Sequence, residues 1–297
     1  MLTNIFKYSN IPYKYDYTSK VINLILPYFN DNVNLVLAHA RNDGGYSYEN
    51  NMKKIISSAI VNKFNILYLI GDEDQWRFPI LEEAYYLIFR TYNNNNTCNY
   101  DRVFPIPCGH NLKHILEYNN DSLTDAEIQQ YFKPFDERKL TFSFSGQLAD
   151  NRLAMVNAIF SIKDYFSHYI NITDRFAAGI PLKEFYNILG DSKIAIVPVG
   201  KQIDESFRFF EAARMGCIIL TDFPVDKYKD VWYYNNAAAH QIHDWRELDA
   251  ALIVNLLNNS IQNKEVIQYY EDKLSFNAVA EYITKIIKQK TNGQFNL

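Results

Sequence analysis

The chain has 297 residues, of which 48% are hydrophobic and 15% aromatic, and its formal net charge at pH 7 is -4. This length suits two modest domains better than one, and the apolar content is sufficient for packed cores, which excludes an intrinsically disordered chain. The acidic balance and the lack of a Lys/Arg-rich block argue against a nucleic-acid partner.

Neither a targeting segment nor a membrane span is indicated by the sequence. The N-terminus lacks the long apolar stretch of a signal peptide, and no run of about 18 apolar residues occurs. Cys98, Cys108 and Cys217 have no metal-binding or redox spacing, and so few cysteines fit a reducing compartment. We therefore expect a cytoplasmic protein, and peripheral contact with the inner face of a membrane stays open.

The first part of the chain alternates between strand and helix patterns, as in an α/β domain. A capping box from Thr124 to Glu127 marks one helix start, and the charged run at 136–139 is the expected domain boundary. Residues 1–136 are therefore expected to form a first Rossmann-like domain. The other predicted elements are a helix or apolar segment at 21–29, strands at 34–40, 65–70 and 102–107, and helices at 49–62 and 80–92.

The strand at 34–40 leads into a loop that could meet a ligand. It carries His39 near its end and continues into Asp43, Gly44 and Gly45, and paired glycines let a backbone approach a ligand closely. A plain turn explains the same residues, because Asp-Gly is a strong turn dipeptide. Both interpretations stay open at this point.

The strand at 65–70 ends in Gly71-Asp72-Glu73-Asp74. An apolar strand followed by Asp-x-Asp resembles the metal- and diphosphate-binding site of single-domain (GT-A) glycosyltransferases, and paired carboxylates suit Mg²⁺ or Mn²⁺. The pattern is short and frequent by chance, so a solvated acidic loop explains it as well. We expect no bound metal.

The second part of the chain repeats the alternation of strands and helices. Ser145 and Gly146 are expected to end the first strand of this part and to open a loop, with Arg152 at the start of the next helix. Residues 137–270 are expected to form the second domain, and residues 271–297 a C-terminal helix. The predicted strands are 140–145, 169–173, 194–199 and 217–220, and the predicted helices are 152–166, 181–189, 207–215, 245–258 and one or two within 266–288.

The stretch 191–222 reads as strand, loop, helix and strand, with Ser206 as the N-cap of the helix and Gly216 as its C-cap. Such a unit places a helix N-terminus at the carboxyl end of a parallel strand, where open α/β sheets bind ligands and free N–H groups suit phosphate. Arg208 and Glu211 share a helix face there. A guanidinium can neutralise a diphosphate and a carboxylate can hold sugar hydroxyls, although a surface ion pair has the same spacing.

The segment S-F-R-F-F-E-A-A-R-M-G-C resembles the donor-binding segment of two-domain (GT-B) glycosyltransferases, and most closely that of the exostosin-like group. The resemblance covers about residues 140–225, and Ile219 stands where that group usually has proline. The pattern Ser-x-Arg-x-x-Glu-Ala-x-x-x-Gly-Cys is matched at Ser206, Arg208, Glu211, Ala212, Gly216 and Cys217.

The resemblance implies an α/β fold of two Rossmann-like domains with parallel sheets facing across a cleft, and a C-terminal helix that crosses back onto the first domain. It also implies a glycosyltransferase that moves a sugar from a nucleotide-sugar, with a UDP-sugar favoured, to a hydroxyl of a surface glycan or glycolipid. The nucleotide-sugar is a substrate, and no cofactor is implied. The donor-binding residues that it implies are Ser145, Gly146, Arg152, Lys201, Ser206, Phe207, Arg208 and Glu211.

Within this resemblance Arg208 would stabilise the charge that grows on the leaving diphosphate. An inverting enzyme needs a base for the acceptor, for which Asp43, His39 and Asp72 are candidates, while Gly44 and Gly45 would form an acceptor-side loop. Two alternatives stay open: a metal-dependent GT-A-type transferase built around Asp72 and Asp74, and a non-catalytic α/β protein that binds a nucleotide or glycan.

Overall fold

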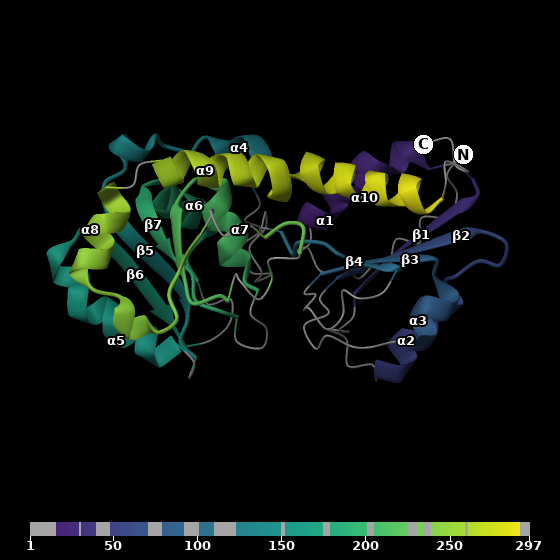
Figure 1. Cartoon of the computed structure of the whole chain (residues 1–297), viewed down its shortest axis with the longest axis horizontal. Coiled ribbons are helices and arrows are strands. Elements are labelled where there is room, and N and C mark those ends of the chain that lie inside the picture. The colour runs from purple at the N-terminus through teal and green to yellow at the C-terminus, as the bar shows by residue number, and fades with distance from the viewer. Residues whose placement is uncertain are drawn as a thin grey trace.

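The computed structural model contains two parallel β-sheets that lie in two separate lobes (Figure 1). Within the described residues, the first sheet has the strand order β1-β2-β3-β4 and the second has the order β6-β5-β7-β8-β9. Parallel strands need crossover connections, and the helices that supply them cover both faces of each sheet. The residues that the structure describes are 16–29, 31–39, 48–70, 79–91, 101–109, 123–149, 152–174, 179–200, 205–224, 228, 231–234, 239–258 and 261–291.

The first lobe is built on a sheet whose strands are buried on both faces. Side chains alternate along a strand, so β2 sends Ile66 and Tyr68 into one core and Leu67 and Leu69 into another. The first core is closed by α1 and α10, and the second by α2 and α3. The elements are α1 Asp16–Ile25, a 3-10 turn at Leu26–Tyr28, β1 Val33–His39, α2 Tyr48–Ser57, β2 Phe64–Ile70, α3 Pro79–Ala84, β3 Leu87–Arg90 and β4 Val103–Pro105.

The predicted helix over 80–92 is wrong in its second half. The helix α3 ends at Ala84, and Leu87–Arg90 forms β3, which is buried between β2 and β4. A short apolar run fits a buried strand and a buried helix equally well, and here pairing with two neighbouring strands decides the outcome. The helix α2 also ends at Ser57, before the predicted residue, and Asn62 in the following turn adopts a φ of 65°.

The second lobe has a core on each side of its sheet. One core packs β5 and β7 against α5 and α8, and the other packs β7 and β8 against α6, α7 and α9. The strand β9 has no counterpart in the prediction. Ile128 of α4, Asp125–Gln129, also lies in the second of these cores, although α4 precedes the boundary expected at 136. The other elements are β5 Leu140–Gln147, α5 Leu153–Ile162, β6 His168–Thr173, α6 Leu182–Gly190, β7 Ser192–Ile196, α7 Phe207–Arg214, β8 Ile218–Thr221, β9 Ala239–Gln241, α8 Ala250–Asn258 and α9 Ile261–Tyr269.

Two local predictions about the second lobe have different outcomes. The capping box from Thr124 to Glu127 is confirmed, since the Thr124 side chain accepts from the Glu127 backbone N–H and the Glu127 carboxylate accepts from the Thr124 backbone N–H. The prediction that Gly146 breaks the strand is wrong, because β5 continues through it to Gln147 and pairs it with Ile172 of β6.

The end of the chain connects the two lobes. After α9, the chain makes a π-helical turn at Tyr270–Leu274 and enters α10, Phe276–Lys290, which packs along α1 on the first lobe (Figure 1). The Tyr17 hydroxyl of α1 donates a hydrogen bond of 2.5 Å to the Leu274 carbonyl. No helix in the described part of the chain is both long and apolar enough to cross a membrane.

Arg138 fixes the far end of α7 against the second sheet. Its side chain is 3% exposed and donates to the backbone carbonyls of Lys133 (2.9 Å), Ser192 (2.8 Å), Met215 (2.6 Å) and Gly216 (3.2 Å). Gly216 has a φ of 64°, which confirms it as the left-handed residue that ends the helix. The guanidinium thus satisfies carbonyls that the helix and strand ends leave without a partner.

Replacing Arg138 with methionine should lower the free energy of unfolding by about 3 kcal/mol, because it leaves several buried carbonyls without a donor. Urea denaturation followed by circular dichroism measures the change. Arg246→Met is the matched control, since Arg246 is exposed and bonds only Asp244 within the described residues. Equal unfolding midpoints for the two variants would contradict this role for Arg138.

Candidate anion-binding site

The candidate site lies at the carboxyl ends of β5 and β7, where the helix α7 begins. Ser206 occupies the N-cap position in an extended conformation, but its side chain makes no capping hydrogen bond. The first turn of α7 therefore carries the partial positive charge of a helix N-terminus without a side-chain cap. Phe207 is half-buried and packs into the core behind the helix, which anchors this turn.

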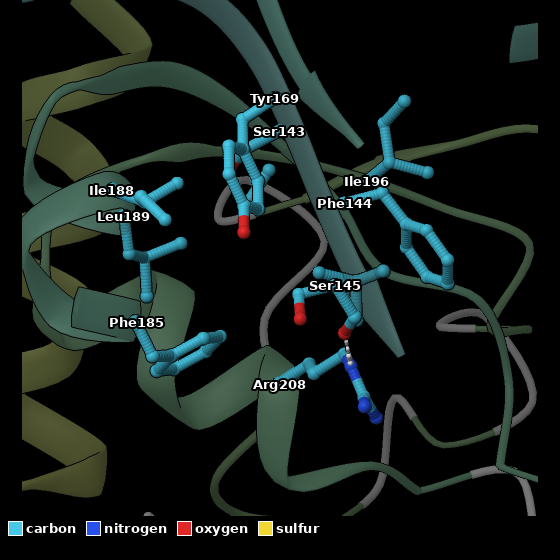
Figure 2. A pocket seen from close by; sticks show the side chains of 11 residues that line it. Ser143, Phe144, Ser145, Tyr169, Phe185, Ile188, Leu189, Ile196 and Arg208 are labelled. Carbon is cyan, nitrogen blue, oxygen red and sulfur yellow. Dashed lines mark hydrogen bonds between the residues drawn. The ribbon is translucent and has the colours of Figure 1, made fainter. Parts of the chain in front are cut away.

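Arg208, the second residue of α7, reaches over the end of β5. Its Nε donates to the Ser145 carbonyl at 2.5 Å, and Figure 2 shows the two terminal nitrogens pointing away from that bond. Neither terminal nitrogen donates to another residue in the described part of the chain. A Cβ atom at position 146 would lie 2.7 Å from Nη2 of Arg208, so the guanidinium fits only because that residue is glycine. The outward edge of the guanidinium is thus available to a ligand.

Arg152 lies beneath this site and is only 5% exposed. Its terminal nitrogens donate to the carbonyl of Gln147 at 3.0 Å and to that of Val199 at 2.9 Å, so it ties the end of β5 to the segment that follows β7. Burial lowers the pKa of Arg152 to about 10, the positive charge of Arg208 lowers it too, and Asp222 opposes the change. Both guanidinium groups lie at the end of β5, where Arg152 donates to the Gln147 carbonyl and Arg208 to the Ser145 carbonyl.

No described carboxylate forms an ion pair with either arginine of this site. Asp222 is otherwise engaged, because its carboxylate accepts hydrogen bonds of 2.8 Å from the Val199 backbone N–H and from the Trp245 indole. Burial lowers the pKa of Arg208, and the charge of Glu211 acts against that shift. Glu211 lies one turn further along α7 and is 4% exposed. Two desolvated cations beside a helix N-terminus form a site that favours an anion.

A pocket adjoins Arg208 on the side of α6 (Figure 2). It has a volume of about 340 Å³ including its open mouth, and it lies between the sheet and α6. Partial burial raises the pKa of the Tyr169 hydroxyl, and Glu184 adds to that rise. No local sequence pattern predicts this pocket, because most of its lining residues are of types that also fill an ordinary core. Its lining includes Ser143, Ser145, Tyr169, Phe185, Ile188 and Arg208.

The first-lobe residues proposed from the sequence are not all described. His39 is the last residue of β1, in agreement with a position at a strand end, but its side chain lies outside the description. Within the ranges that are described, no group of three His, Cys, Asp or Glu side chains could hold a metal ion. The predicted site residues that fall outside the described ranges are Asp43, Gly44, Gly45, Asp72, Asp74 and Lys201.

No protein-family model and no characterised protein matches the sequence, but solved structures match the fold. One is an alpha-glucosyltransferase in complex with UDP and a 13-mer DNA containing a central A:G mismatch, with a TM-score of 0.52, 11% identity, and coverage of 93% of this chain and 84% of that one. Another is a pneumococcal O-GlcNAc transferase in complex with UDP and GlcNAc, with a TM-score of 0.50, 11% identity, and coverage of 91% and 59%.

The chain has the GT-B fold. An alpha-glucosyltransferase in complex with UDP-glucose and DNA containing an abasic site matches similarly, with a TM-score of 0.51, 10% identity, and coverage of 93% of this chain and 84% of that one. The predicted fold class is confirmed by the two parallel sheets and by these matches. The single-domain GT-A fold, on which the alternative interpretation of Asp72 and Asp74 depended, is wrong.

Replacing Gly146 with alanine should weaken the binding of UDP about tenfold, because the added Cβ occupies the place of the Arg208 guanidinium. Stability should change little, since Gly146 has no left-handed φ and the displaced group is the end of a flexible side chain. Isothermal titration calorimetry measures the affinity. Gly179→Ala, at a position with no atom within 4 Å of the new methyl, is the control. Equal affinities for both variants would show that Arg208 does not hold the ligand.

Proposed function

We propose that the protein is a glycosyltransferase that moves a sugar from a nucleotide-sugar, favouring a UDP-sugar, to a hydroxyl of a glycan or glycolipid acceptor. The observation that carries this proposal is the Arg208 guanidinium, whose Nε is held by the Ser145 carbonyl while its two terminal nitrogens point away from that bond and form no ion pair with a carboxylate among the described residues. Two of the solved structures that share the fold are an alpha-glucosyltransferase and an O-GlcNAc transferase in complex with UDP, which supports the same assignment.

The chemistry follows from where charge develops during transfer. When the bond between the sugar and the diphosphate breaks, negative charge grows on the diphosphate oxygens, and donors already in place stabilise it without reorganisation. Arg208 supplies the direct contact and the N-terminus of α7 supplies its dipole. Each terminal nitrogen of Arg152 already donates to a backbone carbonyl, so in this proposal Arg152 contributes through its charge.

The roles of the other residues are part of the proposal. Glu211 accepts hydrogen bonds from donor hydroxyls, which match a carboxylate's acceptor capacity. Ser145 lies where the donor would approach, since its carbonyl orients Arg208 and its hydroxyl accepts from Asn171 at 3.2 Å. Asp43, His39 and Asp72 are the proposed bases for the acceptor if the enzyme inverts configuration. Gly44 and Gly45 form the proposed acceptor-side loop, and Lys201 and Ser206 add donors for the diphosphate.

We also propose a family and a cellular setting for the enzyme. The Ser-x-Arg-x-x-Glu-Ala pattern supports an exostosin-like transferase, and the boundaries 1–136, 137–270 and 271–297 remain our proposal for the domains. A cytoplasmic enzyme of surface-polysaccharide synthesis fits this proposal. A non-catalytic nucleotide-binding protein is the competing interpretation, and an assay of sugar transfer or donor hydrolysis with UDP-, GDP- and CMP-sugars distinguishes the two.

Replacing Arg208 with alanine should weaken UDP binding by about 10- to 100-fold, since one charge-assisted contact to the diphosphate is lost. A thermal-shift titration shows this as a smaller rise in Tm at a fixed UDP concentration. Arg246→Ala removes an exposed arginine of the same lobe and should leave the rise intact. An undiminished rise in Arg208→Ala would refute the proposed donor site.

Donor binding should not need a divalent cation, because two arginines and a helix N-terminus already provide positive charge at the site. We expect the Kd of UDP to stay within about twofold when EDTA replaces Mg²⁺, a small effect on the scale of a single contact. Calorimetry with and without EDTA tests this. A loss of affinity that Mn²⁺ restores, and that Asp74→Asn abolishes, would instead assign a metal role to the acidic loop at 72–74.

A further inference from the structure

A buried carboxylate lies three residues before Arg208, at the entrance to α7. Glu205 is 8% exposed, and its Oε1 accepts the Cys108 backbone N–H at 3.0 Å while its Oε2 accepts the Tyr233 hydroxyl at 3.1 Å. Cys108 follows β4 of the first lobe, 97 residues away in sequence. The start of the proposed donor-binding helix is therefore bonded directly to the first lobe.

The segment 231–234, which we call the bridging segment, extends this connection. The indole of Trp232 donates to the Pro105 carbonyl of β4 at 2.8 Å and stacks on Tyr282 of α10 with ring centroids 4.0 Å apart. The Tyr233 carbonyl accepts from the Tyr269 hydroxyl of α9 at 2.5 Å. Glu205 is thus the point at which the first lobe, the bridging segment and the entrance to α7 meet.

This carboxylate lacks a cationic partner among the described residues. Burial raises the pKa of Glu205, and the hydrogen bonds from Cys108 and from the tyrosines only oppose that rise. The other titratable groups that face it are the hydroxyls of Tyr17, Tyr234 and Tyr269, whose own pKa values burial raises well above the ordinary value. A buried carboxylate without a cation costs stability, whereas an apolar or neutral polar residue of the same size would cost less.

We propose that Glu205 is a positioning residue for the donor site. It holds the first turn of α7 against the first lobe, so that the Arg208 guanidinium stays in the position that binds the donor. The inference rests on the proposed function, because it assigns a role within the same site. Glu205 does not reach the ligand. Its carboxylate fixes Glu205 directly before the N-cap Ser206, and Arg208 is the second residue of the helix that follows. Donor affinity thus depends on a contact made by the first lobe.

The raised pKa of Glu205 predicts how the stability of a glutamine variant depends on pH. A carboxyl whose pKa is raised in the folded state stabilises the fold below its ordinary pKa, and this stability is lost as the pH rises through the raised value. At pH 8 the folded protein therefore carries a cost that a glutamine would remove. Glu205→Gln should be at least as stable as wild type at pH 8, with the advantage shrinking toward pH 5. A carboxylate whose ionised form stabilised the fold would instead make Glu205→Gln less stable than wild type at pH 8.

The test combines stability with affinity. We expect Glu205→Gln to keep or raise the Tm at pH 8 and yet to bind UDP about tenfold more weakly, since the amide can satisfy only one of the two donors as the carboxylate does. Tyr233→Phe, which removes one donor and leaves the carboxylate, should weaken UDP binding about threefold. Glu281→Gln, on the exposed side of α10, should change neither quantity.

A double-variant cycle shows whether Glu205 acts through Arg208. In the Arg208→Ala background, Glu205→Gln should change the Kd of UDP less than about twofold, because the side chain that it positions is gone. Full affinity in Glu205→Gln, a loss that matches its unfolded fraction, or additive losses in the double variant would each overturn the inference. If the wild-type protein binds neither UDP nor inorganic pyrophosphate, the proposed function fails and this inference fails with it. If the wild type binds UDP and Glu205→Gln binds it equally well, only the inference is overturned.

Discussion

The anion site depends on two guanidinium groups, one buried and one half-buried, that backbone carbonyls hold at the end of β5. Arg152 and Arg208 are both partly or fully withdrawn from water, and neither has a carboxylate ion pair within the part of the chain that is described. Backbone carbonyls of Ser145, Gln147 and Val199 hold them instead. Carbonyl dipoles offset part of the desolvation cost but not the net charge, so the site keeps a positive potential.

The parallel sheet explains why carbonyls are present at this place. At the carboxyl edge of a parallel sheet, the last residues of each strand present carbonyls that no longer pair within the ladder. Arg208 uses one at the end of β5, and Arg152 links that end to the segment that follows β7. Gly146 then leaves the space that the Arg208 side chain needs. The two arginines thus depend on the carbonyls at the strand ends for hydrogen bonds, and Arg208 also depends on the space that Gly146 leaves.

Much of this arrangement could be predicted from the sequence, and each wrong prediction has a physical reason. Continuous apolar runs identified β1, β2, β7 and β8, because strands buried on both faces leave that signature. The strand β3 was assigned to a helix, since a four-residue run carries no usable period. Gly146 was taken for a strand end because a glycine in a strand often marks one, whereas here it makes room for a side chain 62 positions away in the chain.

The candidate site, too, is only partly predictable from the sequence. Arg208 and Glu211 follow from helical spacing, which is a local property of the sequence. The bond of Arg208 to Ser145 and that of Glu205 to Cys108 are contacts between distant segments, and no local pattern specifies them. Glu205 falls in the loop predicted before the N-cap Ser206, where a charged residue is ordinarily solvated, so the sequence does not indicate its burial.

The two carboxylates near the entrance to α7 have opposite electrostatic effects. Glu211 lies one turn along the helix and its charge acts on Arg208, so it reduces the positive potential while offering acceptor oxygens. Each oxygen of Glu205 accepts one hydrogen bond, from the Cys108 backbone N–H and from the Tyr233 hydroxyl. Both contacts lie at the junction between the lobes, and the charge that acts on Arg208 is that of Glu211. This separation lets a carboxylate order the start of the helix without neutralising the arginine that the helix presents.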